Sequence, residues 1–265
     1  MKRLLNFILF LTVLNACGVK EEQTVELKVM SYNIRHGVGL DTVLDLSRAA
    51  AIIASQSPDI CGLQEVDNFC FRSDSISQID YLSQHTKMTG TFGRFMDYQG
   101  GAYGMATLSA KPLISIKVLE LPDAKYEPRS SIVHEVEVAK NCQLVFANVH
   151  FDWIDEKEGI DIRLSQAKAL VQYVNTLNKA VVITGDFNCT PESPTMQYFS
   201  NQGFTFVNKG VDNLSFQGES KSEIDHLIFR ESENVKIREK GVQLLKVPIA
   251  SDHRPLIVTL EISYE

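Results

Sequence analysis

The stretch "GDFN" near the middle of the chain places a carboxylate and an amide two residues apart. Asp186 and Asn188 follow the apolar run at residues 180–184. On an extended segment, side chains at positions i and i+2 point to the same side. A carboxylate and an amide carbonyl on one face suit a hard cation that binds oxygen. Taken by itself, the stretch is equally compatible with an Asx-type turn.

The stretch "SDHRPL" near the end of the chain places a second carboxylate beside an imidazole. Asp252 and His253 precede Pro255 and the apolar run at residues 256–262. Proline restricts the backbone and stops a helix. Histidine has an ordinary pKa close to neutral, which suits proton transfer. The alternative interpretation is a polar turn without chemistry.

Four further polar residues stand at the edges of apolar runs. They are Asn33, Glu65, His150 and Asp225. Taken singly, each has a structural explanation: a turn asparagine, a solvated carboxylate or a histidine whose hydrogen bonds are satisfied. Strand ends, however, are rigid platforms on which sites are built. The occurrence of all these residues together, each at a strand edge, favours a site over unrelated turns.

Alternating or continuous apolar runs predict the strands that carry these residues, and apolar residues at helical spacing predict helices between them. The predicted strands cover residues 25–34, 59–66, 142–151, 180–188, 224–229 and 256–262. The predicted helices cover residues 41–57, capped by Asp41 and ended by Pro58, residues 74–90, closed by Gly90, and residues 163–178. Strands mixed with helices predict sheets covered by helices. No repeat or low-complexity linker interrupts residues 24–265, so we expect one domain there.

The first residues predict an exported protein. Lys2 and Arg3 precede an apolar run at residues 4–14 that is too short to span a bilayer, as in a secretory signal. "LNAC" resembles a bacterial lipoprotein box, which implies a signal peptide at residues 1–16, lipid on Cys17 and a tether at residues 17–23. An ordinary cleaved signal and a short anchor are the alternatives. We expect a membrane-anchored lipoprotein of a bacterial cell envelope, in the outer membrane, and "KEE" after Cys17 points to the cell surface.

Composition restricts the function classes. The 265 residues carry a net charge of -7, with 44% hydrophobic and 22% charged residues. A broad basic surface, the footprint of nucleic-acid binding, is not evident. The acidic balance does not exclude an enzyme that engages phosphate through a metal. Cys61, Cys70, Cys142 and Cys189 lack the CxxC spacing of a zinc site, and Cys61 and Cys142 read as buried thiols. A disulfide in an exported chain stays open.

Nine stretches together resemble the endonuclease/exonuclease/phosphatase superfamily, the deoxyribonuclease-I-like fold. They are "SYNIRHG", "DICGLQEVD", "YGMATLSAKPL", "PRSSIVHEVEV", "NVHFD", "RLSQAKAL", "GDFNCTPES", "IDHLIF" and "SDHRPL", and they cover nearly all of residues 27–262. The resemblance implies an α/β (α+β) four-layer sandwich of two packed mixed sheets flanked by helices. It implies a site at the edge of both sheets and hydrolysis of phosphate esters with Mg²⁺ or Mn²⁺.

The resemblance also implies roles for individual residues. The implied metal-binding residues are Asn33, Glu65, Asp186, Asn188 and Asp252. The implied catalytic residues are His150, Asp186, Asn188, Asp225 and His253, with Asp225 orienting one histidine. The implied phosphate contacts are Tyr103, Arg129, His150 and Asn188. Whether Asp186 or His253 is the general base stays open. Met105 departs from the pattern, since many relatives have asparagine there.

The expected activity is that of a lipid-anchored phosphodiesterase in which a metal-oriented water attacks phosphorus. Acidity, the expected anchor and the lack of a DNA-gripping insertion favour a small or lipid-derived phosphodiester, as in a sphingomyelinase. The alternatives are a secreted metal-dependent nuclease and a non-catalytic surface lipoprotein. The expected partners are a phosphate-ester substrate and, through the lipid, a membrane, with nucleic acid as a substrate only. We expect a monomer.

Overall fold

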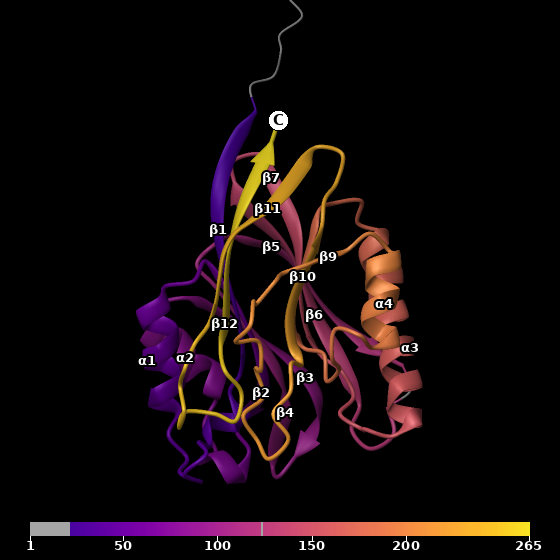
Figure 1. The fold of residues 1–265 in the computed structure, drawn as a ribbon. Coiled ribbons are helices and arrows are strands. Elements are labelled where there is room, and N and C mark those ends of the chain that lie inside the picture. The colour runs from indigo at the N-terminus through magenta and orange to yellow at the C-terminus, as the bar shows by residue number, and fades with distance from the viewer. Residues whose placement is uncertain (1–21, 123) are drawn as a thin grey trace, which may run out of the picture.

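Two six-stranded mixed β-sheets form the centre of the structure, a computed structural model that describes residues 22–122 and 124–265 (Figure 1). The first sheet has the order β11-β12-β1-β2-β4-β3. Its strands are β1 (Gln23–Asn33), β2 (Ile60–Asn68), β3 (Thr89–Tyr98), β4 (Gly101–Ser109), β11 (Val235–Leu244) and β12 (Leu256–Tyr264). The β1–β2 pair is parallel, and the other pairs of this sheet are antiparallel.

The second sheet has the same plan, with the order β5-β6-β7-β8-β10-β9. Its strands are β5 (Leu113–Leu121), β6 (Arg129–Ala139), β7 (Cys142–His150), β8 (Val181–Asp186), β9 (Thr205–Phe206) and β10 (Asp225–Arg230). Again one pair, β7–β8, is parallel and the others are antiparallel. The strands predicted from apolar runs are therefore present.

Apolar side chains point alternately to the two faces of the strands, so both faces of each sheet are buried. In β1, Leu27 and Val29 belong to the core between the sheets, where they share a cluster with Phe146 of β7. Met30 and Tyr32 point to the opposite side and pack in a cluster with the helices that cover the first sheet. This is the period of two that a strand imposes on its side chains.

Helices cover the outer face of each sheet. The helices α1 (Leu46–Gln56) and α2 (Gln78–Thr86) pack on the first sheet, and α3 (Lys157–Asn175) and α4 (Pro194–Asn201) pack on the second. Figure 1 shows the two pairs on opposite sides of the sheets. Two short 3-10 turns, η1 (Arg35–Gly37) and η2 (Phe71–Ser73), lie in loops of the first half. The expected four-layer sandwich is confirmed.

The start of the first predicted helix was wrong. The helix α1 begins at Leu46, and Asp45 is its N-cap, because the Asp45 side chain accepts a hydrogen bond from the Ser47 amide. Asp41 instead accepts from the Val43 amide and forms an ion pair with Arg48. A short side chain that bonds its own backbone two residues on makes a turn before the helix, and this local bond separates Asp41 from α1.

Three other helix boundaries were also wrong, and one is the start of α2, which begins at Gln78 rather than at residue 74. The helix α2 ends at Thr86, because Lys87 adopts a left-handed conformation with φ 59°, and Gly90 lies inside β3. The helix α3 begins at Lys157, six residues before the predicted start at residue 163. Its first turns include the buried Gly159 and Ile162, whose packing extends the helix beyond the sequence pattern.

The predicted signal peptide, Cys17 and the tether up to residue 21 lie outside the described residues. Among residues 22–122 and 124–265, no helix is both long and apolar enough to cross a membrane. The four cysteines in these residues are buried free thiols, as predicted for Cys61 and Cys142.

A buried asparagine joins the two sheets behind the edge where β1, β2, β7 and β8 end. Asn148 of β7 donates from Nδ2 to the carbonyls of Leu63 and Ala106 in the first sheet, at 2.9 and 2.8 Å. Its Oδ1 accepts from Gln64 Nε2 at 2.7 Å. A Cβ on Gly62 would lie 2.8 Å from that oxygen, so glycine is required there. These bonds fix the end of β7 relative to the end of β2.

We predict that a second buried polar residue, His134, limits stability in acid. Its side chain is 0% exposed, neither ring nitrogen has a hydrogen-bond partner, and burial lowers its pKa from 6.5 to about 4. The unfolded chain binds a proton that the folded chain rejects. Stability is therefore present above pH 6.5 and is lost as the pH falls toward 4, by up to about 3 kcal/mol.

His134→Leu should raise the free energy of unfolding near neutral pH by about 1–3 kcal/mol, since an unsatisfied buried group is removed. The Tm should rise accordingly. The substitution should also remove this part of the acid loss, as measured by thermal unfolding at several pH values. His85→Leu, at an exposed position on α2, is the matched control. A His134→Leu protein with the same pH dependence as the wild type would contradict the assignment.

Candidate active site

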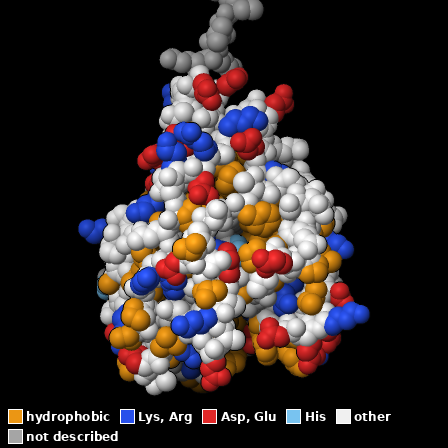
Figure 2. Space-filling model, viewed as in Figure 1, with side chains coloured by type: hydrophobic (Ala, Val, Ile, Leu, Met, Phe, Trp, Pro, Cys, Tyr) orange, Lys and Arg blue, Asp and Glu red, His pale blue; other side chains and the backbone are white. Residues whose placement is uncertain are grey.

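One cavity of about 420 Å³ gathers most of the residues singled out in the sequence. Its lining includes Glu65, Tyr103, Arg129, His150, Asp186, Asn188, Asp252 and His253. Figure 2 shows acidic and hydrophobic side chains around the centre of one face, and basic side chains scattered rather than gathered on it. Asn33 and Asp225 touch the lining residues from behind. Strand ends from both sheets thus meet around one hollow, as predicted.

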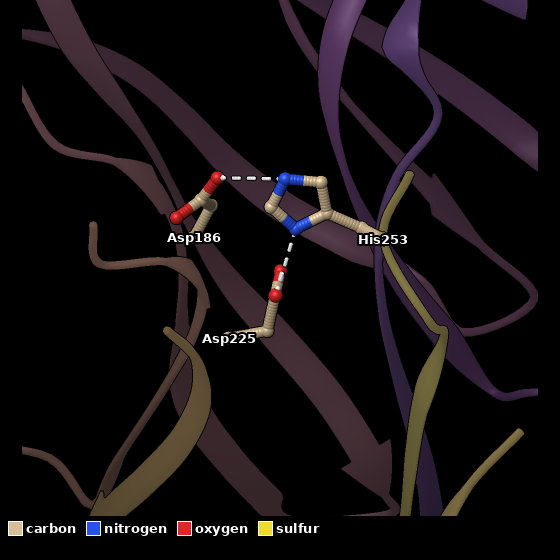
Figure 3. Close-up of side chains that lie close together, drawn as sticks. All are labelled: Asp186, Asp225 and His253. Atoms are coloured by element: carbon tan, nitrogen blue, oxygen red, sulfur yellow. Dashed lines mark hydrogen bonds and ion pairs between the residues drawn. The ribbon is translucent and has the colours of Figure 1, made fainter. Parts of the chain in front are cut away.

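The most compact group in the site is a histidine between two carboxylates (Figure 3). His253 Nδ1 lies 2.8 Å from Asp225 Oδ2, and His253 Nε2 lies 3.6 Å from Asp186 Oδ2. Asp225 begins β10 in the second sheet, whereas His253 precedes β12 in the first sheet. The Asp225 amide donates to Ser215 Oγ, which fixes the start of β10. Asp225 therefore orients His253, and this contact joins the two sheets.

The charges of this group support one another. Burial opposes a charged imidazole, but the carboxylates of Asp225 and Asp186 outweigh burial and raise the pKa of His253 to about 10. Burial also opposes a charged Asp225, yet the neighbouring His253 holds the pKa of that carboxyl below its ordinary value. His253 is therefore an imidazolium near neutral pH and donates from both ring nitrogens.

Asp186 is the carboxylate at the centre of the cavity. Its Oδ1 accepts from the Asn188 amide at 2.9 Å, and its Oδ2 accepts from Asn33 Nδ2 at 3.2 Å. Burial, together with the charge of Asp225, raises its pKa to about 7 against the opposing charge of His253. Asn188 donates its side-chain nitrogen to the Phe151 carbonyl, so the amide oxygen is the atom left for a ligand.

An acidic wall, formed by Glu65 and Asp252, lies on the side of the first sheet. Glu65 adopts φ 55° at a bulge between β2 and β4, and its Oε1 accepts from Asn33 Nδ2 at 3.0 Å. Burial opposes its charge, but His36 and Asn33 hold its pKa well below the ordinary value. Asp252 Oδ2 lies 3.2 Å from Arg35 Nε, and burial raises the pKa of Asp252.

A basic wall, formed by Arg129 and His150, lies on the side of the second sheet. Arg129 is 2% exposed, and its guanidinium lies 3.1 Å from Glu127 and 3.5 Å from His150 Nδ1. Burial and the charge of Arg129 lower the pKa of His150 to about 3. A neutral His150 that accepts from Arg129 on Nδ1 carries its proton on Nε2, which lies 3.6 Å from Asp186. Tyr103 of β4 also lines the cavity, and Arg72 lies over its ring.

The oxygen atoms of the acidic wall fit a divalent cation better than the compact group does. Asp186, Asp225 and His253 offer ligand atoms within 4.8 Å of one another, but a histidine must be neutral to bind a metal. Glu65 and Asp252 face the same cavity with Asp186 and supply carboxylate oxygens, which Mg²⁺ and Mn²⁺ prefer. The donor chemistry therefore fits the expected ion.

Asn33 holds the carboxylates together in this structure. Its amide nitrogen donates to both Glu65 and Asp186, and its Oδ1 accepts from the Arg35 amide at 3.0 Å. A carbonyl oxygen keeps a second lone pair after one hydrogen bond. A direct metal contact through Asn33 Oδ1 stays a prediction.

The sequence reasoning missed several residues that bear on the site. They are Arg35 and His36 beside the acidic wall, and Arg72, Glu127 and Asp155 in the cavity lining. Arg35 and His36 follow Asn33 closely, so their position in "SYNIRHG" was the available signal. Arg254 of "SDHRPL" pairs with Asp212 and the Leu244 carbonyl, away from the cavity lining.

We predict that Asp186→Asn stabilises the metal-free fold. The folded pKa of Asp186 lies above the unfolded value of 3.8, so ionisation costs stability as the pH rises toward about 7. In chelating buffer at alkaline pH, the variant should therefore have a free energy of unfolding roughly 1–3 kcal/mol above that of the wild type, and a higher Tm. In acid, the two proteins should have similar Tm values. Asp97→Asn, at an 83% exposed side chain, is the control. A lower Tm for Asp186→Asn at alkaline pH would contradict this charge balance.

Comparisons with known proteins agree with this geometry. Residues 30–253 match the model of the endonuclease/exonuclease/phosphatase family. The carbon catabolite repressor protein 4 homolog 3 of Arabidopsis thaliana is 21% identical over 168 residues, which span 61% of this chain and 36% of that protein. The chain thus spans about a third of the length of that relative.

Solved structures share the fold. An endonuclease/exonuclease/phosphatase from Beutenbergia cavernae superposes with a TM-score of 0.74 at 19% identity, over 89% of this chain and 71% of that one. One from Bacteroides vulgatus gives a TM-score of 0.70 at 20% identity, over 89% and 98% of the two chains. The family match extends over most of the sequence and includes the residues of the cavity. The chain belongs to the endonuclease/exonuclease/phosphatase family.

Proposed function

We propose that this protein is a divalent-metal-dependent phosphodiesterase whose substrate is a small or lipid-derived phosphodiester. Members of its family are hydrolytic phosphoesterases, typically with a divalent metal. The observation that carries the proposal is the single cavity in which the acidic wall, the basic wall and His253 meet. An anionic ester repels a nucleophile, and a site with separate anion-binding and cation-binding walls offsets that repulsion.

The acidic wall, together with Asp186, would hold the ion. Glu65, Asp252 and Asp186 supply carboxylate oxygens, with Asn188 and Asn33 supplying amide oxygens. When bound, Mg²⁺ or Mn²⁺ supplies positive charge next to the phosphate and lowers the pKa of water.

The basic wall would hold the phosphate. Arg129 is buried and charged, so it can donate two charge-assisted hydrogen bonds to phosphate oxygens. His150 donates from Nε2 on the same side, and the Tyr103 hydroxyl, whose pKa burial raises, stays protonated as a further donor. These groups orient the phosphorus toward Asp186 and the attacking water.

The protons divide between Asp186 and His253. Asp186 lies at the centre of the cavity with carboxylate oxygens that can accept a proton from the attacking water, whereas a charged His253 cannot accept one. His253 is charged and donates from Nε2, so it stabilises the charge that develops on the phosphate or the leaving oxygen. Asp225 keeps this ring in place and charged. The proposal therefore assigns the base role to Asp186.

To test the proposal, the full-length protein is incubated with Mg²⁺, phosphatidylcholine and sphingomyelin vesicles and plasmid DNA together, and the products are identified by mass spectrometry. We expect release of phosphocholine, with a loss of about 100-fold or more in His253→Ala, because proton transfer and charge stabilisation contribute on this scale. His85→Ala, an exposed histidine on α2, should retain full activity. Nicked DNA without phosphocholine would make the protein a nuclease. The absence of both products would contradict both the lipid phosphodiesterase and the nuclease.

We further propose that Cys17 carries lipid and that the protein is exported to the cell envelope. The sequence pattern at residues 1–17 supports this. The described chain starts at the end of the sandwich where Gln23 pairs with Tyr264, near the label of the C-terminus in Figure 1. The strand β1 then runs for 11 residues, about 30 Å, before it reaches Asn33 at the site. An anchored protein would therefore present its cavity away from its own membrane.

This geometry favours a soluble diester or a lipid in a facing membrane over a lipid of the anchoring membrane. We predict that labelled palmitate is incorporated by the wild type in a bacterial host and not by Cys17→Ser. The Cys61→Ser variant, at a buried thiol, is the control. Incorporation of palmitate by the Cys17→Ser variant would contradict the assignment of lipid to Cys17. A wild-type chain that keeps residues 1–16 would contradict the predicted cleavage after residue 16.

A further inference from the structure

An aromatic and acidic rim borders the cavity on the side of the basic wall. We define the rim as Tyr126, Glu127, Trp153 and Asp155. Trp153, Glu127 and Asp155 line the cavity. Trp153 is 51% exposed and stacks on Tyr126, which is 65% exposed, with ring centroids 6.2 Å apart and planes 26° apart. Two large aromatic rings are thus held in solvent at the mouth of the site.

The rim has the chemistry of a cation site. Aromatic faces attract ammonium groups within about 6 Å of the ring. The rim already shows this property, because Lys125 Nζ lies 5.3 Å from the centre of the Tyr126 ring. Asp155 is exposed and forms no ion pair within residues 22–122 and 124–265. Trp153 and the unpaired carboxylate of Asp155 therefore line the cavity together.

The rim is also adjacent to the phosphate position. Glu127 belongs to the rim and lies 3.1 Å from Arg129, the proposed phosphate-binding residue. A ligand whose phosphate contacts Arg129 therefore extends its ester group over the rim if the group points out of the cavity.

We propose that the rim binds a quaternary ammonium group, so that the substrate is a phosphodiester with a choline-type ester on the Trp153 side. This rests on the phosphodiesterase proposed above and names the substrate class of that site. A quaternary ammonium is weakly hydrated and donates no hydrogen bonds, so it binds an indole face next to carboxylates with little loss of hydration. A nucleobase would also stack on Trp153. The phosphates that flank it in a nucleic acid would, however, meet Asp155 and Glu127.

The first test compares two esters with the same leaving group, 4-nitrophenyl phosphorylcholine and 4-nitrophenyl 3,3-dimethylbutyl phosphate, which has carbon in place of nitrogen. With the full-length protein and Mg²⁺, kcat/KM should favour the choline ester by about tenfold. Trp153→Ala and Asp155→Asn should each bring the ratio of the two kcat/KM values close to one. Trp153→Phe should retain most of the preference, and Asp161→Asn, an exposed acid on α3, should retain all of it.

The second test is independent of turnover. Trp153 is the single tryptophan of the chain, so tryptophan fluorescence reports on the rim alone. Phosphocholine should quench or shift it in the wild type at a concentration at which 3,3-dimethylbutyl phosphate does not. Equal kcat/KM values for the two esters in the wild type, or a response to thymidine monophosphate and not to phosphocholine, would overturn the proposal. Hydrolysis of neither ester, with a selective phosphocholine response, would overturn the phosphodiesterase proposal and support cation binding by the rim.

Discussion

The hydrogen bonds of Asn148 across the two sheets are the interaction on which the site depends. The first sheet and its loops supply Asn33, Glu65, Tyr103, Asp252 and His253, and the second supplies Arg129, His150, Asp186, Asn188 and Asp225. Apolar packing alone holds two sheets together with little preference for register. Asn148 bonds two backbone carbonyls and one side chain of the opposite sheet, and Gly62 leaves the room that this requires. The walls of the cavity can therefore face each other with fixed spacing.

The site concentrates charge where burial opposes it. Asp186 and Asp225 are buried carboxylates and Glu65 is partly buried, and burial is the largest influence on the pKa of each. The nearby His253 opposes the effect of burial on all three carboxylates, and hydrogen bonds from Asn33, Asn188 and Ser215 support their charged forms. Asn33 bonds two of the carboxylates, yet the like charges still face one cavity. A divalent cation would relieve this repulsion, so the same arrangement that weakens the metal-free fold creates affinity for an ion.

Much of the fold could be predicted from the sequence, since apolar runs mark the strands and polar residues mark their ends. The motifs from "SYNIRHG" to "SDHRPL" also identified the residues that the structure brings together. The histidine that Asp225 orients could not be read, because Asp225 and His253 lie 28 residues apart on different sheets. The acidic wall needs the left-handed conformations of Arg35, His36 and Glu65, which no local pattern announces. The start of α1 was misplaced because Asp41 and Asp45 offer the same capping chemistry, and Asp41 forms a local turn with Val43 instead.

The division of the cavity into an ion-binding acidic wall and a charged histidine that Asp225 orients is the central claim. Titration of the full-length protein with Mn²⁺, followed by electron paramagnetic resonance of the free ion, tests it most directly. Glu65→Gln should weaken binding by about tenfold or more, as loss of a carboxylate ligand does, while Asp225→Asn should change it by less than about threefold. Glu26→Gln, at an exposed site on β1, is the control. Loss of Mn²⁺ binding in Asp225→Asn with retention in Glu65→Gln would place the ion in the compact Asp186–Asp225–His253 group and contradict the account.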